Sequence, residues 1–194
     1  MTRIGRFLSI ATLAATVGCS SPHSRFYTLA ATATPGGGRD AGYTVAVGPI
    51  SIPAYADRPE LVVQVAPHQV KVEEYDRWAA PLEDDIARVV AGDLQALLGT
   101  PRVAVGPMVS FVPAYRVTID VQRFESTPGD SAVVEAVWVV EKRGTSDTLS
   151  GRTIAHEAVD GKTYGALAAA HSRALETMSR DIAEAIRTLA TKRR

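Results

Sequence analysis

The sequence predicts an α+β fold: a single domain in which a mostly antiparallel or mixed β-sheet packs against two amphipathic helices, at about 81–98 and 163–191. Two observations indicate this class. Short apolar segments bounded by Pro and Gly occur before the first helix and again between the two helices, as expected of strands. Apolar residues recur at three- and four-residue steps within the two helical segments. Neither an internal repeat nor a linker divides residues 19–194, so we expect one domain there, preceded by a signal peptide over 1–18.

The first 18 residues have the layout of a bacterial secretory signal. Arg3 and Arg6 form a positive region, an apolar run follows, and Gly18 precedes Cys19. The apolar run is too short to span a bilayer, which takes roughly 20 residues. Cys19 is the only cysteine in the sequence, and a lone cysteine after this kind of run looks like a lipobox. We therefore predict a lipoprotein signal peptide that ends at residue 18 and acylation, palmitate included, at Cys19.

The alternative is an ordinary cysteine, in a cleaved secretory signal or in an uncleaved anchor. Thr16 leaves it open, because the strongest lipoboxes have Leu at that place. Acylation of Cys19 by more than one chain would give stable anchoring, since each buried methylene group contributes ~0.8 kcal/mol. Ser20 and Ser21 resemble the pattern that is sorted to the outer membrane. We expect a soluble domain in the cell envelope, held to the outer membrane by lipid and facing the periplasm.

Four strands are predicted in the first part of the chain. They cover residues 25–29, 43–50, 61–65 and 70–73. The segment 30–42, rich in Ala, Thr, Gly and Pro, is predicted to be a flexible loop. Pro49 and Pro53 are expected to end central pairing of the second strand, because proline cannot donate a ladder hydrogen bond. The strand 61–65 is apolar on both faces and is expected inside a sheet, and a turn at 67–69 makes it one arm of a hairpin.

The helix at 81–98 is predicted from one apolar stripe. The stripe consists of Leu82, Ile86, Val89, Val90, Leu94, Leu97 and Leu98. Pro81 suits the first helical turn, where its missing N–H costs nothing. The acidic residues at 83–85 are favoured there by the helix dipole, and Gly99 is a natural end for the helix.

Four strands are predicted between the helices. They cover 103–105, 115–122, 133–140 and 148–158. Turn residues at 127–130 and 144–147 join the last three strands, which are therefore expected to form an antiparallel meander. The final strand is polar enough to be an edge strand.

The second helix begins near Tyr164, and its stripe repeats at helical spacing. The stripe consists of Leu167, His171, Leu175, Met178, Ile182, Ile186 and Leu189. His171 lies on this apolar stripe, where a buried and hydrogen-bonded histidine is expected rather than a metal ligand. The basic residues at 192–194 complement the negative end of the helix dipole.

The charge of the chain is balanced, with 21 basic and 21 acidic residues. Removal of the signal peptide takes away two arginines and leaves 19 basic against 21 acidic residues. A nucleic-acid-binding protein would normally show a basic face, and strong adhesion to anionic lipid head groups also requires positive charge. We therefore expect no nucleic-acid partner and no purely electrostatic membrane binding.

The sequence lacks the patterns that accompany catalysis. None of the four histidines belongs to a pair at metal-ligand spacing, and the nucleophile elbow, the Walker loop and the dinucleotide-binding glycine pattern are absent. The carboxylates at 73–74 and 83–85 form the only acidic clusters, and a solvated strand end and a helix start explain them better than a two-carboxylate hydrolase. We expect no enzyme, no metal and no cofactor.

Three pieces of the sequence resemble a known family. They are Phe-Tyr-Thr-Leu at 26–29, Pro-x-Tyr-x-Asp-Arg-Pro at 53–59 and Arg-Trp-x-x-Pro-Leu at 77–82. Together they resemble the PqiC-type family, the auxiliary lipoproteins of ABC-type transport systems. The glycine-rich stretch at 35–38 departs from the family pattern.

The resemblance implies an α+β domain that works with ABC transporter components and with an MCE-domain (mammalian cell entry) protein, which together move lipids between two membranes. The lipoprotein would dock the periplasmic part of the transporter at the outer membrane and support membrane integrity, and a homo-oligomer would suit that role. The family implies no catalytic residues. Two alternatives are a lipid-binding carrier, which requires an apolar cavity between sheet and helices, and a structural envelope lipoprotein.

Four residues are candidates for partner binding. Tyr55, Asp57 and Arg58 lie on a connection stiffened by prolines, where both a structural and a docking role fit. Trp78 is either a core residue beside the helix start or an exposed anchor, since Trp and Arg are favoured at interface hot spots.

Overall fold

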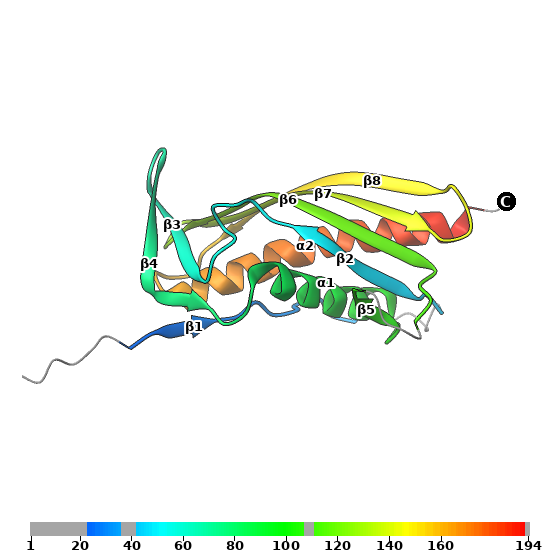
Figure 1. Ribbon diagram of the computed structural model, residues 1–194, viewed down its shortest axis with the longest axis horizontal. Coiled ribbons are helices and arrows are strands. Elements are labelled where there is room, and N and C mark those ends of the chain that lie inside the picture. Colours follow the sequence, from blue (N-terminus) through cyan, green and yellow to red (C-terminus); the bar gives the residue numbers. More distant parts are fainter. Residues whose placement is uncertain (1–22, 36–41, 107–110, 193–194) are drawn as a thin grey trace, which may run out of the picture.

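The computed structural model describes residues 23–35, 42–106 and 111–192, so the predicted signal peptide and Cys19 lie outside the described residues. The elements in chain order are β1 (Arg25–Tyr27), β2 (Val45–Ser51), β3 (Glu60–Ala66), β4 (Gln69–Trp78), α1 (Leu82–Leu98), β5 (Val103–Val105), β6 (Tyr115–Thr127), β7 (Ser131–Lys142), β8 (Thr148–Ala158) and α2 (Tyr164–Thr191). The predicted α+β domain with two amphipathic helices is confirmed (Figure 1).

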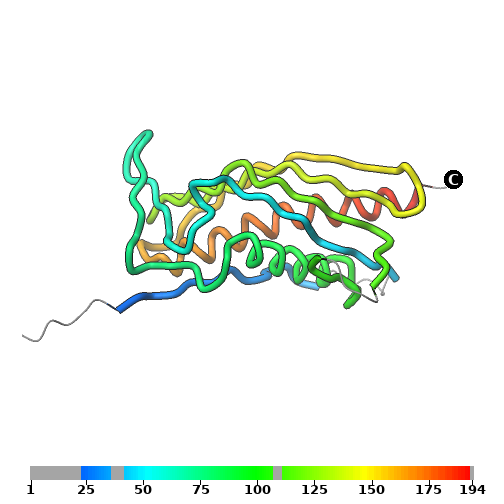
Figure 2. The backbone as a smooth tube through the Cα atoms, viewed as in Figure 1, coloured from blue at the N-terminus to red at the C-terminus, as the bar shows by residue number. Residues whose placement is uncertain are grey.

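The strands form two sheets rather than one. The larger sheet has the order β5-β2-β6-β7-β8, and α1 and α2 pack side by side against one of its faces (Figure 1). Strands β6, β7 and β8 form the predicted antiparallel meander with β8 at the edge, whereas β2 runs parallel to both β5 and β6. The smaller sheet has the order β1-β4-β3, and its β3–β4 hairpin projects from one end of the molecule (Figure 2).

Both helices have the boundaries that the sequence predicts. Gly99 follows α1 with a left-handed backbone at φ 63°, and Pro81 stands at its N-terminal boundary. Thr163 caps α2 by accepting a hydrogen bond from the amide of Ala166. The apolar stripes of the two helices are buried against the larger sheet, where Val45, Val47 and the inward residues of β6 and β7 complete one core.

The prediction that Pro49 ends central pairing is confirmed, because β5 pairs with β2 only as far as Val47 and the rest of β2 has β6 as its one neighbour among the described strands. Strand β2 continues to Ser51 and pairs with β6 on both sides of a bulge that lies between Val47 and Ile50. Pro49 is inside the bulge, where the ladder is interrupted and a missing N–H is tolerated.

The expectation that 61–65 lies inside a sheet is wrong, because β3 is an edge strand and β4 is central. Leu61 and Val63 are buried on the face of β3 that packs on the body. Val65 continues the same strand beyond the body and is 53% exposed. The apolar character of both faces therefore reflects the projecting hairpin and not a central position.

A tryptophan on β7 fits only because a glycine stands opposite it on β8. Trp138 and Gly151 are direct cross-strand partners, and a Cβ added to Gly151 would lie 2.3 Å from the Trp138 ring. The indole Nε1 donates to Thr153 at 3.0 Å, and the Thr153 hydroxyl donates to Asp181 of α2 at 2.6 Å. This chain of contacts holds the edge of the meander to the second helix.

We predict that Gly151→Ala destabilises the domain by about 1–3 kcal/mol, because the added methyl overpacks the site of the Trp138 ring. The measurement is the free energy of unfolding in urea. The control is Ser150→Ala at the exposed neighbouring position of β8, for which a change within about 0.5 kcal/mol is expected. Equal losses in the two variants would contradict the packing argument.

Candidate partner-binding site

Three of the four predicted partner-binding residues lie on the turn that connects β2 to β3, residues 53–59. The amides of Ala56 and Asp57 donate to the carbonyl of Pro53 at 2.9 and 3.2 Å, and these bonds close the turn. Ala56 is buried beneath it. The 53–59 turn is thus a fixed platform whose outward residues are held in place by backbone bonds and by proline.

The outward side chains of the 53–59 turn differ in how they are held. The Tyr55 hydroxyl accepts a hydrogen bond from the amide of Phe124 on β6 at 2.9 Å, although the residue is 42% exposed. Arg58 donates to Glu60 at 3.3 Å. Asp57 is exposed, and within the described part of the chain its carboxylate has neither a hydrogen bond nor an ion pair. The turn therefore presents one negative charge that is not neutralised inside the protein.

Trp78, the fourth candidate, lies in the core. It is 6% exposed, and its ring packs edge-on against Phe124 and His171, with ring centroids 6.0 and 6.4 Å away. Its amide donates to the carbonyl of Pro59 at 2.7 Å, at the end of the 53–59 turn. The first of the two alternatives for Trp78 is the observed one, and the residue supports the turn from beneath.

A serine and a histidine lie within hydrogen-bonding distance in the same core. Ser126 Oγ lies 2.8 Å from His171 Nε2, and the imidazole stacks on Phe124 at 3.9 Å. His171 is fully buried, and its Nδ1 has no hydrogen-bond partner among the described residues. A nucleophile–base pair needs a third group that orients the base and a path for substrate. Within the described residues no third group bonds to His171 Nδ1, and the Ser126–His171 contact joins β6 to α2.

Sequence reasoning missed how the first described residues are held. Residues 25–34, which we call the strap, begin as β1 on the edge of β4 and then run along the two helices (Figure 1). The amide of Leu29 donates to Asp85 of α1 at 2.8 Å, and the amide of Ala30 donates to Ser172 of α2 at 3.1 Å. Residues 30–34 of the strap belong to the predicted 30–42 loop, of which residues 36–41 lie outside the described residues.

The strap is held most firmly at Asp93. This carboxylate is fully buried in α1 and accepts the amides of Thr32 and Ala33 at 2.9 and 3.0 Å, together with the hydroxyl of Ser179 of α2 at 3.2 Å. Burial raises the pKa of Asp93 above its ordinary value, and the three hydrogen bonds oppose that shift. One side chain thus joins the strap, α1 and α2.

The residue before Asp93 makes room for the strap. A Cβ on Gly92 would lie 2.9 Å from the Cβ of Ala31, and glycine inside a helix otherwise costs about 1 kcal/mol relative to alanine. An acidic residue next to a mid-helix glycine, within reach of an apolar stripe, was the signal in the sequence. It was missed because the stripe alone explained the helix.

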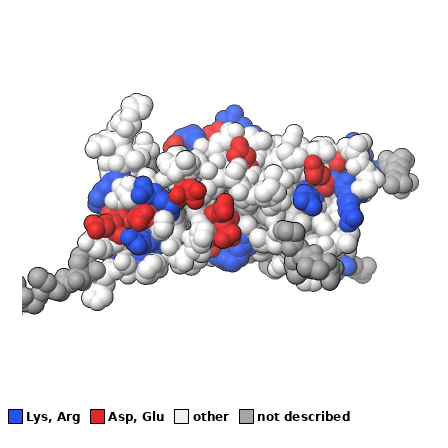
Figure 3. Space-filling view, in the orientation of Figure 1, with Lys and Arg blue, Asp and Glu red and all other residues white. Residues whose placement is uncertain are grey.

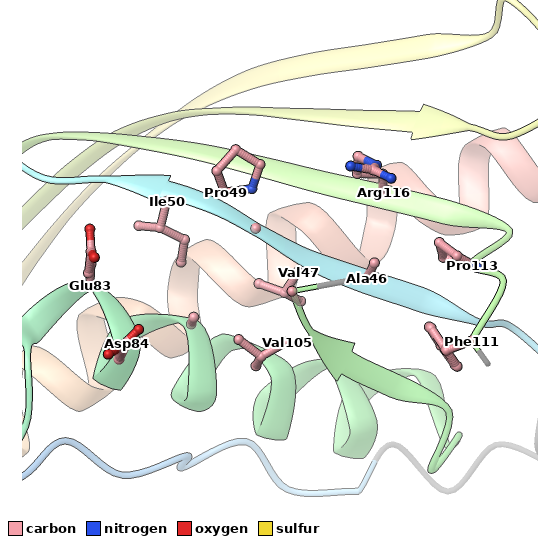
Figure 4. A pocket seen from close by; sticks show the side chains of 13 residues that line it. Ala46, Val47, Pro49, Ile50, Glu83, Asp84, Val105, Phe111, Pro113 and Arg116 are labelled. Atoms are coloured by element: carbon pink, nitrogen blue, oxygen red, sulfur yellow. The ribbon is translucent and has the colours of Figure 1, made fainter. Parts of the chain in front are cut away.

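A surface groove of about 380 Å³ lies between the first half of α1 and the β2–β5 pair (Figure 4). Its walls are mainly apolar, with Val47, Ile50 and Val105 among them. Glu83 and Asp84 stand at the rim, where α1 begins (Figure 4). Arg116 also lines the groove, so its charged side chains are of both signs (Figure 4).

No described helix is long and apolar enough to cross a membrane. Among the described residues, no group of three or more His, Cys, Asp or Glu side chains is placed to hold a metal ion.

Comparisons with known proteins identify a family and similar folds. The family model for the "ABC-type transport auxiliary lipoprotein component" matches residues 27–183. A crystal structure of a DUF330-family protein from Xanthomonas campestris has a TM-score of 0.70 at 20% sequence identity, over 87% of this chain and 100% of that one. A crystal structure of an uncharacterized protein has a TM-score of 0.67 at 16% identity, over 84% and 99%. At these identities the two structures establish the fold alone. A search of curated proteins gives no match.

We predict that Asp93→Ala lowers the free energy of unfolding by about 2–4 kcal/mol, because two strap amides and one hydroxyl lose their buried acceptor. Urea unfolding measures the loss, and hydrogen exchange at Thr32 and Ala33 locates it. The control is Asp84→Ala, an exposed carboxylate in the first turn of the same helix, for which about 1 kcal/mol or less is expected. Unchanged protection of the two amides would contradict the assignment.

A second prediction concerns pH. Burial lowers the pKa of His171 to about 3, whereas an unfolded histidine titrates near 6.5. Between these values the unfolded chain binds one more proton, so the stability that His171 contributes is complete above pH ~6.5 and falls by roughly 1.4 kcal/mol per unit as the pH is lowered toward 3.

The variant His171→Gln keeps a partner for Ser126 and does not titrate, so urea unfolding between pH 4.5 and 7 is expected to show a shallower pH dependence. Asp93, whose raised pKa acts in the opposite direction, is present in both proteins and cancels in the difference. Parallel stability curves would refute the prediction.

Proposed function

The chain belongs to the family of ABC-type transport auxiliary lipoproteins, and on this premise we propose that it is a lipid-anchored accessory subunit of an ABC/MCE-type lipid transport system. Membership gives an accessory role in transport and a place in the cell envelope, and it is not membership of an enzyme family. The finer proposal is that the protein, acylated at Cys19, faces the periplasm from the outer membrane. There it docks an MCE-domain protein and so supports membrane integrity.

The observation that carries the docking proposal is the 53–59 turn. It is rigid, because its backbone bonds and the Tyr55–Phe124 bond fix it to the body. It also carries an unpaired charge, because the Asp57 carboxylate has no partner within the described residues. A preorganised turn loses little conformational entropy on binding, and an unpaired charge selects a partner with complementary charge.

The position of the turn also suits docking at a membrane. The last residue of β4, Trp78, pairs with Tyr27 of β1 on one side and bonds to Pro59 on the other. The turn and β1 are therefore about two strand spacings apart, or roughly 10 Å. Five residues separate Cys19 from Arg25, so a partner on the turn would be held near the anchored surface.

The strap makes the anchor part of the domain. A load on Cys19 would act on β1 and then on the amides bonded to Asp85 and Asp93. Because these carboxylates belong to α1, a load that acts on β1 is passed to the core through the strap. This arrangement fits a protein that holds a large assembly at a fixed distance from a membrane.

The lipid-carrier alternative required an apolar cavity between sheet and helices. That space holds side chains: Leu94, Met178 and Ile182 are fully buried there. The groove in Figure 4 lies on the surface beside α1 and has carboxylates at its rim. These observations favour docking over carriage of lipid inside the domain.

We predict that a photo-crosslinking amino acid at position 57 captures the MCE-domain protein in intact cells, whereas the same amino acid at position 141 does not. Glu141 is the matched control, an exposed acidic residue near the β7–β8 turn at the opposite end of the sheet. Asp57→Asn is expected to reduce recovery of the transporter by several-fold in affinity purification, while Glu141→Gln leaves it unchanged. Because Asp57 has no internal partner, the urea midpoint should stay the same.

The other outcomes separate the alternatives. Recovery of phospholipid without a transporter component would support the carrier. Recovery of neither, from protein shown to be acylated and in the outer membrane, would support a structural lipoprotein. Equal crosslinking at positions 57 and 141 would refute the turn as the docking surface.

A further inference from the structure

The projecting end of the β3–β4 hairpin is uncharged. Residues 64–70, which we call the tip, read Gln-Val-Ala-Pro-His-Gln-Val. Val65 and Val70 are 53% and 57% exposed. In the space-filling view the tip is white, while Lys, Arg, Asp and Glu gather at the base of the hairpin (Figure 3). The tip is therefore uncharged and carries two exposed valines, and exposed apolar side chains that gather in one place mark interaction sites.

Exposed apolar side chains concentrate in the small sheet. Of the nine large hydrophobic residues that are exposed in the described part of the chain, five lie in β1, β3 and β4: Phe26, Val65, Val70, Val72 and Tyr75. This sheet is much the smaller of the two. The concentration therefore is a property of this end of the molecule and not of the surface in general.

The exposed valines of the hairpin lie toward its projecting end. Val62 pairs with Val72 and Gln64 pairs with Val70, so Val70 and Val72 share one face. Val65 lies in the register shift between Gln64 and Ala66, so Val65 and Val70 stand on the two sides of the turn. The tip has no Lys, Arg, Asp or Glu with which to pair a protein partner's charges, and apolar side chains without charge suit a lipid surface.

The predicted anchor can reach the same level. Strands β1 and β4 are parallel, with Arg25 opposite Asp76. Cys19 precedes Arg25 by six residues, and Val70 precedes Asp76 by six residues. At about 3.3 Å per residue each segment spans up to roughly 20 Å. Acyl chains on Cys19 and the side chain of Val70 can therefore lie in one membrane surface.

From these observations we infer that the tip, residues 64–70, is a second membrane contact that inserts into the bilayer surface holding the acyl chains. The inference rests on acylation at Cys19 but not on the MCE partner. Insertion is shallow, because β3 has an unpaired edge and open strand edges do not enter the hydrocarbon region. Lys71, whose side chain is 61% exposed and pairs with Glu73 at 2.9 Å, marks the depth at which insertion stops. Its long stem lets the ammonium group stay at the interface. The contact would fix the orientation of the domain on the membrane.

The test uses the full acylated chain in vesicles of phosphatidylethanolamine and phosphatidylglycerol, without transporter. Once Cys19 is acylated, an introduced cysteine is the only thiol, so His68→Cys takes an environment-sensitive fluorophore at the tip. The control is Ser146→Cys, on the exposed turn between β7 and β8 at the far end. The expected result is several-fold stronger quenching by lipid-borne nitroxide at position 68 than at position 146, with the reverse for aqueous iodide.

A second variant separates insertion from mere proximity. Val65→Asp combined with Val70→Asp should abolish the lipid quenching at position 68, while flotation with vesicles and the urea midpoint remain unchanged, because the anchor and the core are untouched. Equal water access at positions 68 and 146 would overturn the inference, as would protection of position 68 that appears only when an MCE protein is added. Failure of the chain to float would show that acylation is missing, and it would overturn the inference by removing the anchor.

Discussion

The arrangement depends on one buried carboxylate. Asp93 receives two amides of the strap and a hydroxyl of α2, and these groups need an acceptor because the strap has no strand partner where it runs along the helices. Buried backbone amides without a partner are costly, so the strap can lie there only if a helix supplies the acceptor. Gly92 supplies the space. The part of the strap around Thr32 and Ala33 is placed by this pair of neighbouring residues.

The consequence is that the proposed functional surfaces lie at one end of the molecule. The strap, the 53–59 turn and the β3–β4 hairpin all meet at the end of β4, where Trp78 pairs with β1 and bonds to Pro59. The proposed partner surface and the proposed membrane contact are therefore carried by one small sheet and the turn beside it, and the large sheet with its helices is the support.

The polar groups of the core show why burial alone does not indicate chemistry. Ser126 and His171 lie within hydrogen-bonding distance, and burial strongly lowers the pKa of the imidazole. Among the described residues His171 Nδ1 has no partner that could orient the imidazole as a base, and Phe124 stacks on its ring. The pair joins β6 to α2, and its energetic effect is a dependence of stability on pH.

The sequence by itself determined what is local. Both helices, the meander and the β3–β4 hairpin followed from periodicity, caps and turn residues, because those signals are contained within one or two elements. It also contained the family pieces at 53–59 and 77–82, but not which of their residues face water: Asp57 does, and Trp78 does not. Only the tertiary structure decided the second sheet, the edge position of β3, the bulge that admits Pro49 and the path of the strap. These features depend on contacts between distant residues, such as the bond between Ala30 and Ser172 across 142 positions, and no local pattern of residues records them.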